Sequence, residues 1–456
     1  MSSIETNAPP PAPTSASPSA PPSSLASNAL SALEAFGQSL AATGPTIAIA
    51  GTVPVIFLSA GTGTLYALLA GTVIVLLVAD ALAVDALERD RAGQDPVAEL
   101  RLLREAGLPA LLIPRRFGGA GQGWRTALAV VREIARADGS IAQLLGYHYV
   151  NLDNLWLAAG LEAQERYGRP SADAQWLWGD AVNPIDPDLK LTPNPDGDGY
   201  RLDGTKTFAT GASTGDVVLT SGEVTGTGEQ LLLVVPHDAP GLTFGQDWDN
   251  LGQRLSASGG VTFDGVEILP EQVIASLGKE DTTPRSSLIT PVIQAVFGHL
   301  YLGIAEGALA AARAYTRGTS RPWVLSGLAS ATEDPYRLAD YGDLAARLTA
   351  TAALADRVAG HVQSAADRGP ELTWEERGEL AVEVAALKVV STDVALDTTA
   401  KVFELTGARA TANRHGFDRF WRNVRTHTLH DPVSYKRREV GDHYLNGTLP
   451  EFTLYT

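Results

Sequence analysis

The pattern of apolar and polar positions divides the chain into helical, extended and again helical stretches. Between residues 84 and 175 apolar side chains recur at helical spacing, as in "VAELRLLREAGLPALLIP" and "WRTALAVVREIARADGS". From residue 176 to 275 the runs are short and β-rich, and turn signals such as "NPDGDG" and "HDAPG" separate them. The helical period returns near residue 285. We therefore expect a mostly helical α+β protein with a compact antiparallel β domain between two helical parts.

The longest helical run, "LTWEERGELAVEVAALKVVSTDVALDTTAKVFELTG", carries its own start and stop signals. Thr373 and Glu376 form a capping-box pattern, in which each residue caps the main chain beside the other. Gly407 is the kind of residue that ends a helix. The pattern predicts one helix between these limits.

The N-terminal part has a different character. Residues 1–44 are rich in Pro, Ser and Ala, a composition that favours disorder. No charged residue occurs between Glu34 and Asp80, so residues 45–82 form an apolar extension. A membrane segment, a buried or poorly ordered extension and a fusion artefact all remain open. The absence of a basic n-region and of an A-x-A site argues against a secretory signal.

The expected organisation has five parts. They are a disordered segment, the apolar extension, an N-terminal helical domain, a middle β domain and a C-terminal helical bundle, at residues 1–44, 45–82, 83–175, 176–280 and 281–456.

Composition narrows the classes of function. The formal net charge of −17 would repel a phosphate backbone, so we expect no nucleic-acid partner. The chain has no cysteine, which excludes disulfides, thiolate nucleophiles, iron–sulfur clusters and cysteine-bound zinc, and suits a cytoplasmic protein. No G-x-G-x-x-G follows a strand, so a dinucleotide-binding Rossmann domain has no support.

The segment "RTHTLHDPVSYK" contains two of the eight histidines, His427 and His430, followed by Asp431. A catalytic acid–base group, a metal pair and a structural corner are all compatible with this pattern. Three-residue spacing would put both histidines on one face of a helix. No third His, Asp or Glu cluster stands at ligand-like spacing, so we expect no metal site.

The order of helices, β domain and helices resembles the acyl-CoA dehydrogenase fold, which has an N-terminal helical domain, a middle β barrel and a C-terminal four-helix bundle. The segments "GYRLDGTKTFATGAS" and "LGQRLSASGGVTFDGVEI" resemble motifs of that superfamily. Three further segments resemble its reduced-flavin-dependent branch, the dibenzothiophene monooxygenases: "REIARADGSIAQLLGYHYVN", "YLGIAEGALAAARAYTRGTSRPW" and "GFDRFWRNVRTHTLHDPVSYK". The resemblance covers about residues 83–447 and does not include residues 1–82.

This resemblance implies a two-component flavin monooxygenase. Such an enzyme takes FMNH2 from a separate NAD(P)H-dependent flavin reductase and forms a flavin C4a-hydroperoxide with O2. It oxygenates a hydrophobic organosulfur or heteroaromatic compound, to sulfoxide or sulfone in the favoured case. The resemblance also implies a cytoplasmic homotetramer. The alternative is an FAD-dependent acyl-CoA dehydrogenase, whose catalytic glutamate would fall at Asp431. Because aspartate is shorter and a proline follows it, that alternative is disfavoured.

The resemblance assigns roles to five residues near the flavin ring. His430 would be the acid–base group nearest the reacting oxygen, since an imidazole can give or hold a proton near neutral pH, and His427 its partner. Tyr147 would steer the oxygen with its hydroxyl, although a core tyrosine is an alternative. Thr210 would present a hydroxyl to the flavin. Asp180 falls where the sulfur monooxygenase has an asparagine, and this departure puts the substrate in doubt.

Three more residues are expected around the cofactor. Arg321 and Arg409 match arginines that neutralise the flavin phosphate, which suits a guanidinium group. Either arginine could instead form a surface salt bridge. Trp248 matches an aromatic residue of the substrate pocket, although an ordinary core tryptophan would look the same.

Overall fold

The structure, a computed structural model, describes residues 64–195 and 197–456, with side chains described from residue 71 onward. These residues belong to one compact unit of the chain, Ile49–Thr456. The expected disordered segment and the first half of the apolar extension lie outside the described residues.

The N-terminal helical part positions one helix, α7, at the centre of the molecule. From residue 64 onward its helices are α3 (Thr64–Ala83), α4 (Ala86–Ala92), α5 (Val97–Glu105), α6 (Trp124–Ala137), α7 (Gly139–Leu157) and α8 (Leu161–Asp173). Helix α7 begins after Asp138, whose carboxylate accepts hydrogen bonds from the main-chain N–H groups of Ser140 and Ile141. Nearly every residue of α7 is buried, so it packs against neighbours on all sides.

Helix α3 brings the end of the apolar extension into the core. Val78, Ala79 and Leu82 are buried in the same core cluster as residues of α6, whereas Leu76 on the same helix is exposed. A core helix of this kind needs only one apolar face. The expected boundary after residue 82 therefore separates residues that pack together.

The β part is one eight-stranded sheet. The strands are β1 (Trp178–Ala181), β2 (Leu189–Pro193), β3 (Tyr200–Lys206), β4 (Val217–Val224), β5 (Gln230–Pro236), β6 (Leu242–Phe244), β7 (Val261–Ile268) and β8 (Val273–Ser276). Their order is β6-β7-β3-β2-β4-β5-β8, and β1 also pairs with β4.

The prediction of an antiparallel β domain is wrong at two strand pairs. Strand β1 pairs with residues 217–220 of β4 and β2 pairs with residues 222–224, and both pairs are parallel. The eight residues of β4 are long enough for two short strands to follow one another along the same edge in the same direction. The sheet is therefore mixed. The prediction failed because turn signals indicate hairpins between neighbouring strands and give no information on parallel pairs between distant strands.

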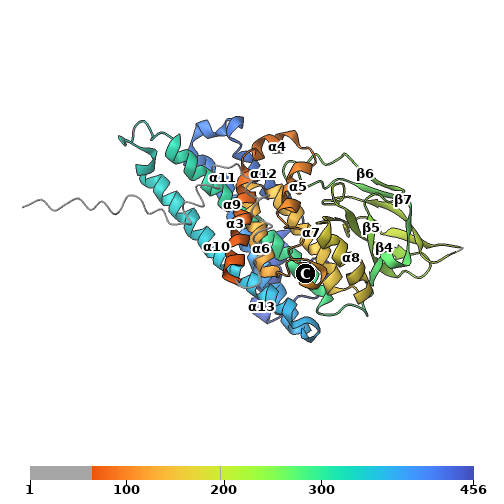
Figure 1. Cartoon of the computed structure of the whole chain (residues 1–456). Helices are drawn as coiled ribbons and strands as arrows, with labels where there is room; N and C mark the ends of the chain where they lie inside the picture. Colours follow the sequence, from red (N-terminus) through yellow and green to blue (C-terminus); the bar gives the residue numbers. More distant parts are fainter. Residues whose placement is uncertain (1–63, 196) are drawn as a thin grey trace, which may run out of the picture. The chain divides into compact units, whose positions relative to one another are not determined.

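The C-terminal bundle contains α9 (Ile289–Gly318), α10 (Pro335–Arg368), α11 (Trp374–Thr406), α12 (Asp418–His427) and α13 (Val433–Asn446). The predicted capping box at Thr373 and Glu376 and the helix end at Gly407 are confirmed. Figure 1 shows the strands gathered on one side of the helices, and α7 contacts both β1 and α9. Helix α7 thus lies between the sheet and the bundle.

Helix α9 is the central helix of this bundle. Its glycines allow close packing, because a side chain at Gly303 or Gly307 would collide with the main-chain oxygens of Arg132 and Arg136 on α6. Among the described residues only this helix, extended to Ser286–Gly318, is long and apolar enough to cross a membrane, and 89% of its most apolar window is buried in the protein. Burial of this extent is that of a core helix.

Candidate active site

Helix α7 carries a row of three buried polar side chains, Gln143, Tyr147 and Asn151. Residues four apart lie on the same face of an α-helix, one above the other. Gln143 and Asn151 bond to the β part, and Tyr147 bonds to the C-terminal bundle. The row therefore joins the sheet and the bundle in one polar site.

Two members of the row reach the β part. The Gln143 amide donates to the Thr210 hydroxyl at 3.3 Å, and Thr210 shares a 3.0 Å hydrogen bond with the Ser258 hydroxyl. The Asn151 amide donates to Oδ2 of Asp180 at 3.4 Å. The main-chain N–H of Asp180 in turn donates to the Thr210 carbonyl at 3.1 Å. Thr210 and Asp180 thus lie together beside α7.

The two loops around Thr210 and Ser258 are held in unusual backbone conformations. Phe208, Gln253 and Ala257 have positive φ angles of 54°, 55° and 47° although none is a glycine. The loops are bonded directly to each other, since the N–H of Ala209 donates to the Gly259 carbonyl at 3.2 Å. Such conformations are costly and concentrate at functional sites.

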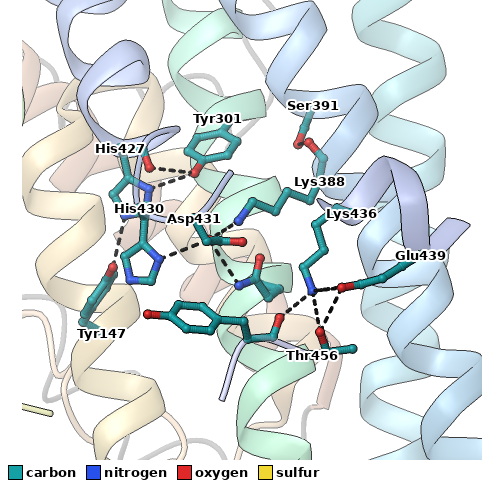
Figure 2. A network of polar contacts seen from close by, with 12 residues as sticks. Tyr147, Tyr301, Lys388, Ser391, His427, His430, Asp431, Lys436, Glu439 and Thr456 are labelled. Atoms are coloured by element: carbon teal, nitrogen blue, oxygen red, sulfur yellow. Dashed lines mark hydrogen bonds and ion pairs between the residues drawn. The ribbon is translucent and has the colours of Figure 1, made fainter. Parts of the chain in front are cut away.

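The third member of the row, Tyr147, reaches the bundle. Its hydroxyl lies 3.3 Å from Nε2 of His427, and Nδ1 of the same ring lies 2.9 Å from the Tyr301 hydroxyl. Figure 2 shows His427 between the two tyrosines. Either neutral tautomer of His427 satisfies this chain of hydrogen bonds, and in one of them the Tyr147 O–H is free to donate to a ligand.

The rings of His427 and His430 lie side by side, and the two residues are joined only through the main chain, where the His430 N–H donates to the His427 carbonyl at 3.0 Å. His427 is the last residue of α12 and is buried, whereas His430 follows in the turn and its side chain is 37% exposed. The rings are nearly parallel, with centroids 6.0 Å apart, and both contact the ring of Phe297. The two histidines therefore have different environments, one buried and one partly exposed, although both rings contact Phe297.

His430 is bonded to an ion pair inside the bundle. Its Nδ1 lies 3.1 Å from Oδ1 of Asp431, and the same oxygen accepts from the Lys388 ammonium group and from the Gln294 amide. Figure 2 shows Asp431 between His430 and Lys388. A carboxylate can only accept, so Nδ1 of His430 carries the proton and donates it.

Burial fixes the charge states around His427. Removal from water lowers the pKa of His427 well below its ordinary value, and nearby His430 and Lys388 add to the effect, so this ring is neutral. Burial also raises the pKa of Tyr147 and of Tyr301, which keeps both hydroxyls protonated. These three groups form a neutral hydrogen-bonding chain.

The two carboxylates of the site behave in opposite ways. Burial raises the pKa of Asp180 to about 7, and hydrogen bonds with Asn151 and the Thr210 main chain offset only part of that effect. Burial also disfavours the charge on Asp431. There the hydrogen bond from His430 and the charge of Lys388 prevail and hold the pKa of Asp431 below its ordinary range.

The two arginines expected at the flavin phosphate lie elsewhere in the chain. The Arg409 guanidinium donates to the Thr319 carbonyl at 3.0 Å, and the Arg321 carbonyl accepts from Arg337. Both lie just beyond the C-terminal end of α9, which is about 25 Å along the helix axis from Tyr301. The structure does not bring them to the His427 site within one chain.

Trp248 lies at the edge of the Thr210 loop. Its ring meets the ring of Phe208 edge to face, with centroids 6.0 Å apart, and its indole N–H donates to the Gln253 carbonyl at 2.8 Å. It is half-buried. The structure thus puts Trp248 beside the loops of the site and not in the protein core.

Sequence reasoning missed several residues that complete the site. Gln143 and Asn151 stand one turn before and after Tyr147, so helical spacing could have found them. Tyr301 begins the segment "YLGIAEGALAAARAYTRGTSRPW", but the resemblance of that segment assigns no role to it, and none of the segments that carry the resemblance contains Lys388. In the part of the chain that the structure describes, no group of three His, Asp or Glu side chains could hold a metal ion.

The fold and site define a flavoprotein of the acyl-CoA dehydrogenase type. Family models match all three parts of the chain: acyl-CoA dehydrogenase N-terminal domain at residues 74–174, middle domain at 187–266 and C-terminal domain at 295–435. The N-terminal match begins within α3, as the core packing requires. The chain belongs to the acyl-CoA dehydrogenase family.

Within that family the similarity is to monooxygenases. The dibenzothiophene monooxygenase of Rhodococcus erythropolis is 43% identical over 378 residues, which are 80% of this chain and 90% of that protein. A probable FMNH2-dependent monooxygenase, SfnC of Pseudomonas putida, is 39% identical over 81% of this chain and 93% of its own length. A crystal structure of TdsC from Paenibacillus sp. A11-2 with FMN and indole has 40% identity, covers 85% of this chain and 99% of that chain, and superposes with a TM-score of 0.82.

Proposed function

We propose that this chain is the oxygenase of a two-component flavin monooxygenase in the cytoplasm. It takes FMNH2 from a separate NAD(P)H-dependent reductase and oxygenates a hydrophobic organosulfur or heteroaromatic compound with O2. In sulfoxidation, one oxygen atom bonds to sulfur and the other leaves as water, with two electrons from FMNH2. The observation that carries the proposal is the Tyr301–His427–Tyr147 chain beside His430, in a protein of this family.

The residues around Thr210 fit a flavin ring. The carbonyl oxygen of the Gln143 side chain is buried and has no hydrogen-bond partner among the described residues, so it can accept from a ring N–H. The Thr210 and Ser258 hydroxyls, bonded to each other, can donate to or accept from ring oxygens and nitrogens. When bound, reduced FMN supplies the electrons that activate O2.

His430 is the group best placed to move a proton. Its Nδ1–H is engaged by Asp431, and its Nε2 makes no hydrogen bond within the described residues. Because the side chain is partly exposed, it can exchange protons with solvent between turnovers. His427, neutral and fixed between two tyrosines, orients the Tyr147 hydroxyl instead.

Asp431 is poorly suited to the dehydrogenase reaction. A base that removes a substrate proton needs a free carboxylate of raised basicity. Asp431 is buried, paired with Lys388, and its pKa is lowered. The paired carboxylate therefore favours oxygenation over acyl-CoA dehydrogenation.

The phosphate-binding arginines come from another protomer in this proposal. FMN is a mononucleotide and cannot extend from the His427 site to the far end of α9 in the same chain. Arg321 precedes three exposed apolar side chains, Trp323, Val324 and Leu325, at 65%, 81% and 80% exposure. Exposed apolar patches of this kind favour contact with a partner surface. In a homotetramer, Arg321 and Arg409 of one protomer could contact the flavin phosphate bound by a neighbour. This arrangement explains both the distance of the arginines from the His427 site of their own chain and the exposed apolar side chains after Arg321.

Product analysis tests the function directly. The purified protein is supplied with a flavin reductase, FMN, NADH and O2, and offered dibenzothiophene, indole and smaller organosulfur compounds. We expect an oxygenated product that depends on the reductase and carries one atom of labelled O2 per transfer. Oxidation of NADH by this chain alone, or reduction of bound flavin by an acyl-CoA, would overturn the proposal.

A further inference from the structure

The Lys388 ammonium group lies inside the helical bundle. Lys388 is 1% exposed in the middle of α11, and its only ionic partner among the described residues is Asp431. Its Nζ also lies 5.2 Å from the ring centroid of Phe297, the ring that both histidines contact. Lysine is rarely buried unless it is paired, because burying its charge costs free energy. The buried position of Lys388 therefore calls for a structural or functional explanation.

Asp431 transmits the position of Lys388 to His430. One oxygen, Oδ1, receives the Lys388 ammonium group, the Gln294 amide at 3.4 Å and Nδ1–H of His430 at 3.1 Å. These contacts come from α11, α9 and the turn after α12, so three segments fix a single carboxylate. With Nδ1–H engaged, the His430 ring has one orientation and presents Nε2.

We propose that Lys388 is a positioning residue of the active site, which holds Asp431 ionised and in place so that Asp431 orients His430. The inference rests on the proposed role of His430 in oxygenation. The pair also sets the charge beside His430. The negative charge of Asp431 lies against the His430 ring, and the positive charge of Lys388 compensates it.

Electrostatics agree with this geometry. Burial lowers the pKa of Lys388 to about 8, and Asp431 counteracts part of that effect, so the pair is ionised at neutral pH. The other titratable groups that face His430 are His427, which is neutral, and Tyr455, whose ring centroid lies 6.5 Å away and whose pKa is raised. Lys436 and Glu439 of α13 act on Lys388 with opposite signs.

The test measures the protonation of His430 in the flavin-free protein, so its result does not depend on whether oxygenation occurs. Diethyl pyrocarbonate acylates neutral imidazole, and fragment mass spectrometry resolves the extent at each histidine. The rate at His430 against pH gives a midpoint. His361, which pairs with Glu383 and is half exposed, serves as the internal reference.

Three variants give distinct expectations. Lys388→Met leaves the carboxylate uncompensated, so the midpoint should rise by about one pH unit. Asp431→Asn leaves the lysine charge, so the midpoint should fall by about the same amount. In the double variant both charges are gone and the midpoint should return close to that of wild type. Lys401→Met, which changes a partly exposed lysine on the same helix, is the matched control and should leave the midpoint unchanged.

Opposite shifts that cancel in the double variant would support the proposal. The proposal would be overturned if the midpoints do not move, or if they move in the same direction in both single variants. A pair that only stabilises the fold would lower stability when broken, but it would not shift the His430 midpoint in opposite directions. Breaking a buried pair costs stability. If one single variant fails to fold, the other single variant compared with the double variant makes the same distinction. In folded variants, the pH dependence of product formed per O2 should follow the midpoints.

Discussion

The Tyr147 hydroxyl lies 3.3 Å from Nε2 of His427, so helices α7 and α12 share one hydrogen bond at the centre of the site. Tyr147→Phe removes this bond and leaves the buried ring nitrogen of His427 without a partner. We expect oxygenation to fall about 10²-fold, the range for loss of one positioned donor. Product per O2 consumed is the measurement. Tyr301→Phe, which acts only through His427, is the comparison and should be milder; equal effects would mean that Tyr147 does not contact the reacting oxygen.

Asp180 makes stability depend on pH in a predictable direction. Its folded pKa, about 7, lies above the ordinary value of 3.8, so the folded protein binds a proton that the unfolded chain has released between these values. Stability associated with Asp180 therefore decreases as pH rises from about 4 to about 7 and stays low above that.

Asp180→Asn removes this dependence. The gain in melting temperature over wild type should be larger at pH 8 than at pH 5, by several degrees. Asp153, whose pKa is also raised to about 7 by burial, is unchanged in both proteins and cancels in the comparison. If the gain from Asp180→Asn is the same at both pH values, Asp180 is ionised throughout and the expectation is wrong.

The shared phosphate site can be tested by mixing two inactive proteins. Arg321→Ala should lose FMNH2 binding and His430→Ala should lose oxygenation. If each site takes its ring contacts from one protomer and Arg321 from another, co-expressed variants should form about a quarter of intact sites. Product formation no greater than the sum of the two parents would mean that each chain binds its own flavin.

Helix α3 should contribute to stability through one face only. Leu82 is 1% exposed, so Leu82→Ala should lower the free energy of unfolding by about 2–5 kcal/mol. Leu76 is 43% exposed on the same helix, so Leu76→Ala should have little effect. Melting temperatures of the two variants give the comparison. Similar values for both would mean that α3 does not pack on the enzyme core.

The sequence could predict the fold because each part has its own hydrophobic period and the motifs occur in family order. It also proposed site roles for Tyr147, Thr210, Asp180, His427 and His430; these roles stay predictions, and the structure brings the five residues together around α7. The motifs could not show that Arg321 and Arg409 lie at the far end of α9. Sequence similarity predicts which residue type stands at a position, but it does not show where the fold places that residue.

Other features depend on contacts that no local pattern encodes. Lys388 and Asp431 are 43 residues apart, and no local pattern shows that the two pair. The sequence placed a domain boundary after residue 82 because hydropathy alone does not show which face of a helix packs against another element. The core position of Val78 and Leu82 becomes clear only when α6 is beside them.

The most direct test of the account is the fate of O2 in His430→Ala, with reductase, FMN and NADH supplied. A general acid–base group typically contributes about 10²–10⁴-fold, so product formation should fall by that order. Consumption of O2 should continue and hydrogen peroxide should replace the product, because the residues proposed to bind the flavin, Thr210, Gln143 and the arginines, are unchanged. His361→Ala, a histidine outside the site, should behave as wild type. Near-normal product formation by His430→Ala, together with flavin reduction by an acyl-CoA, would contradict the account.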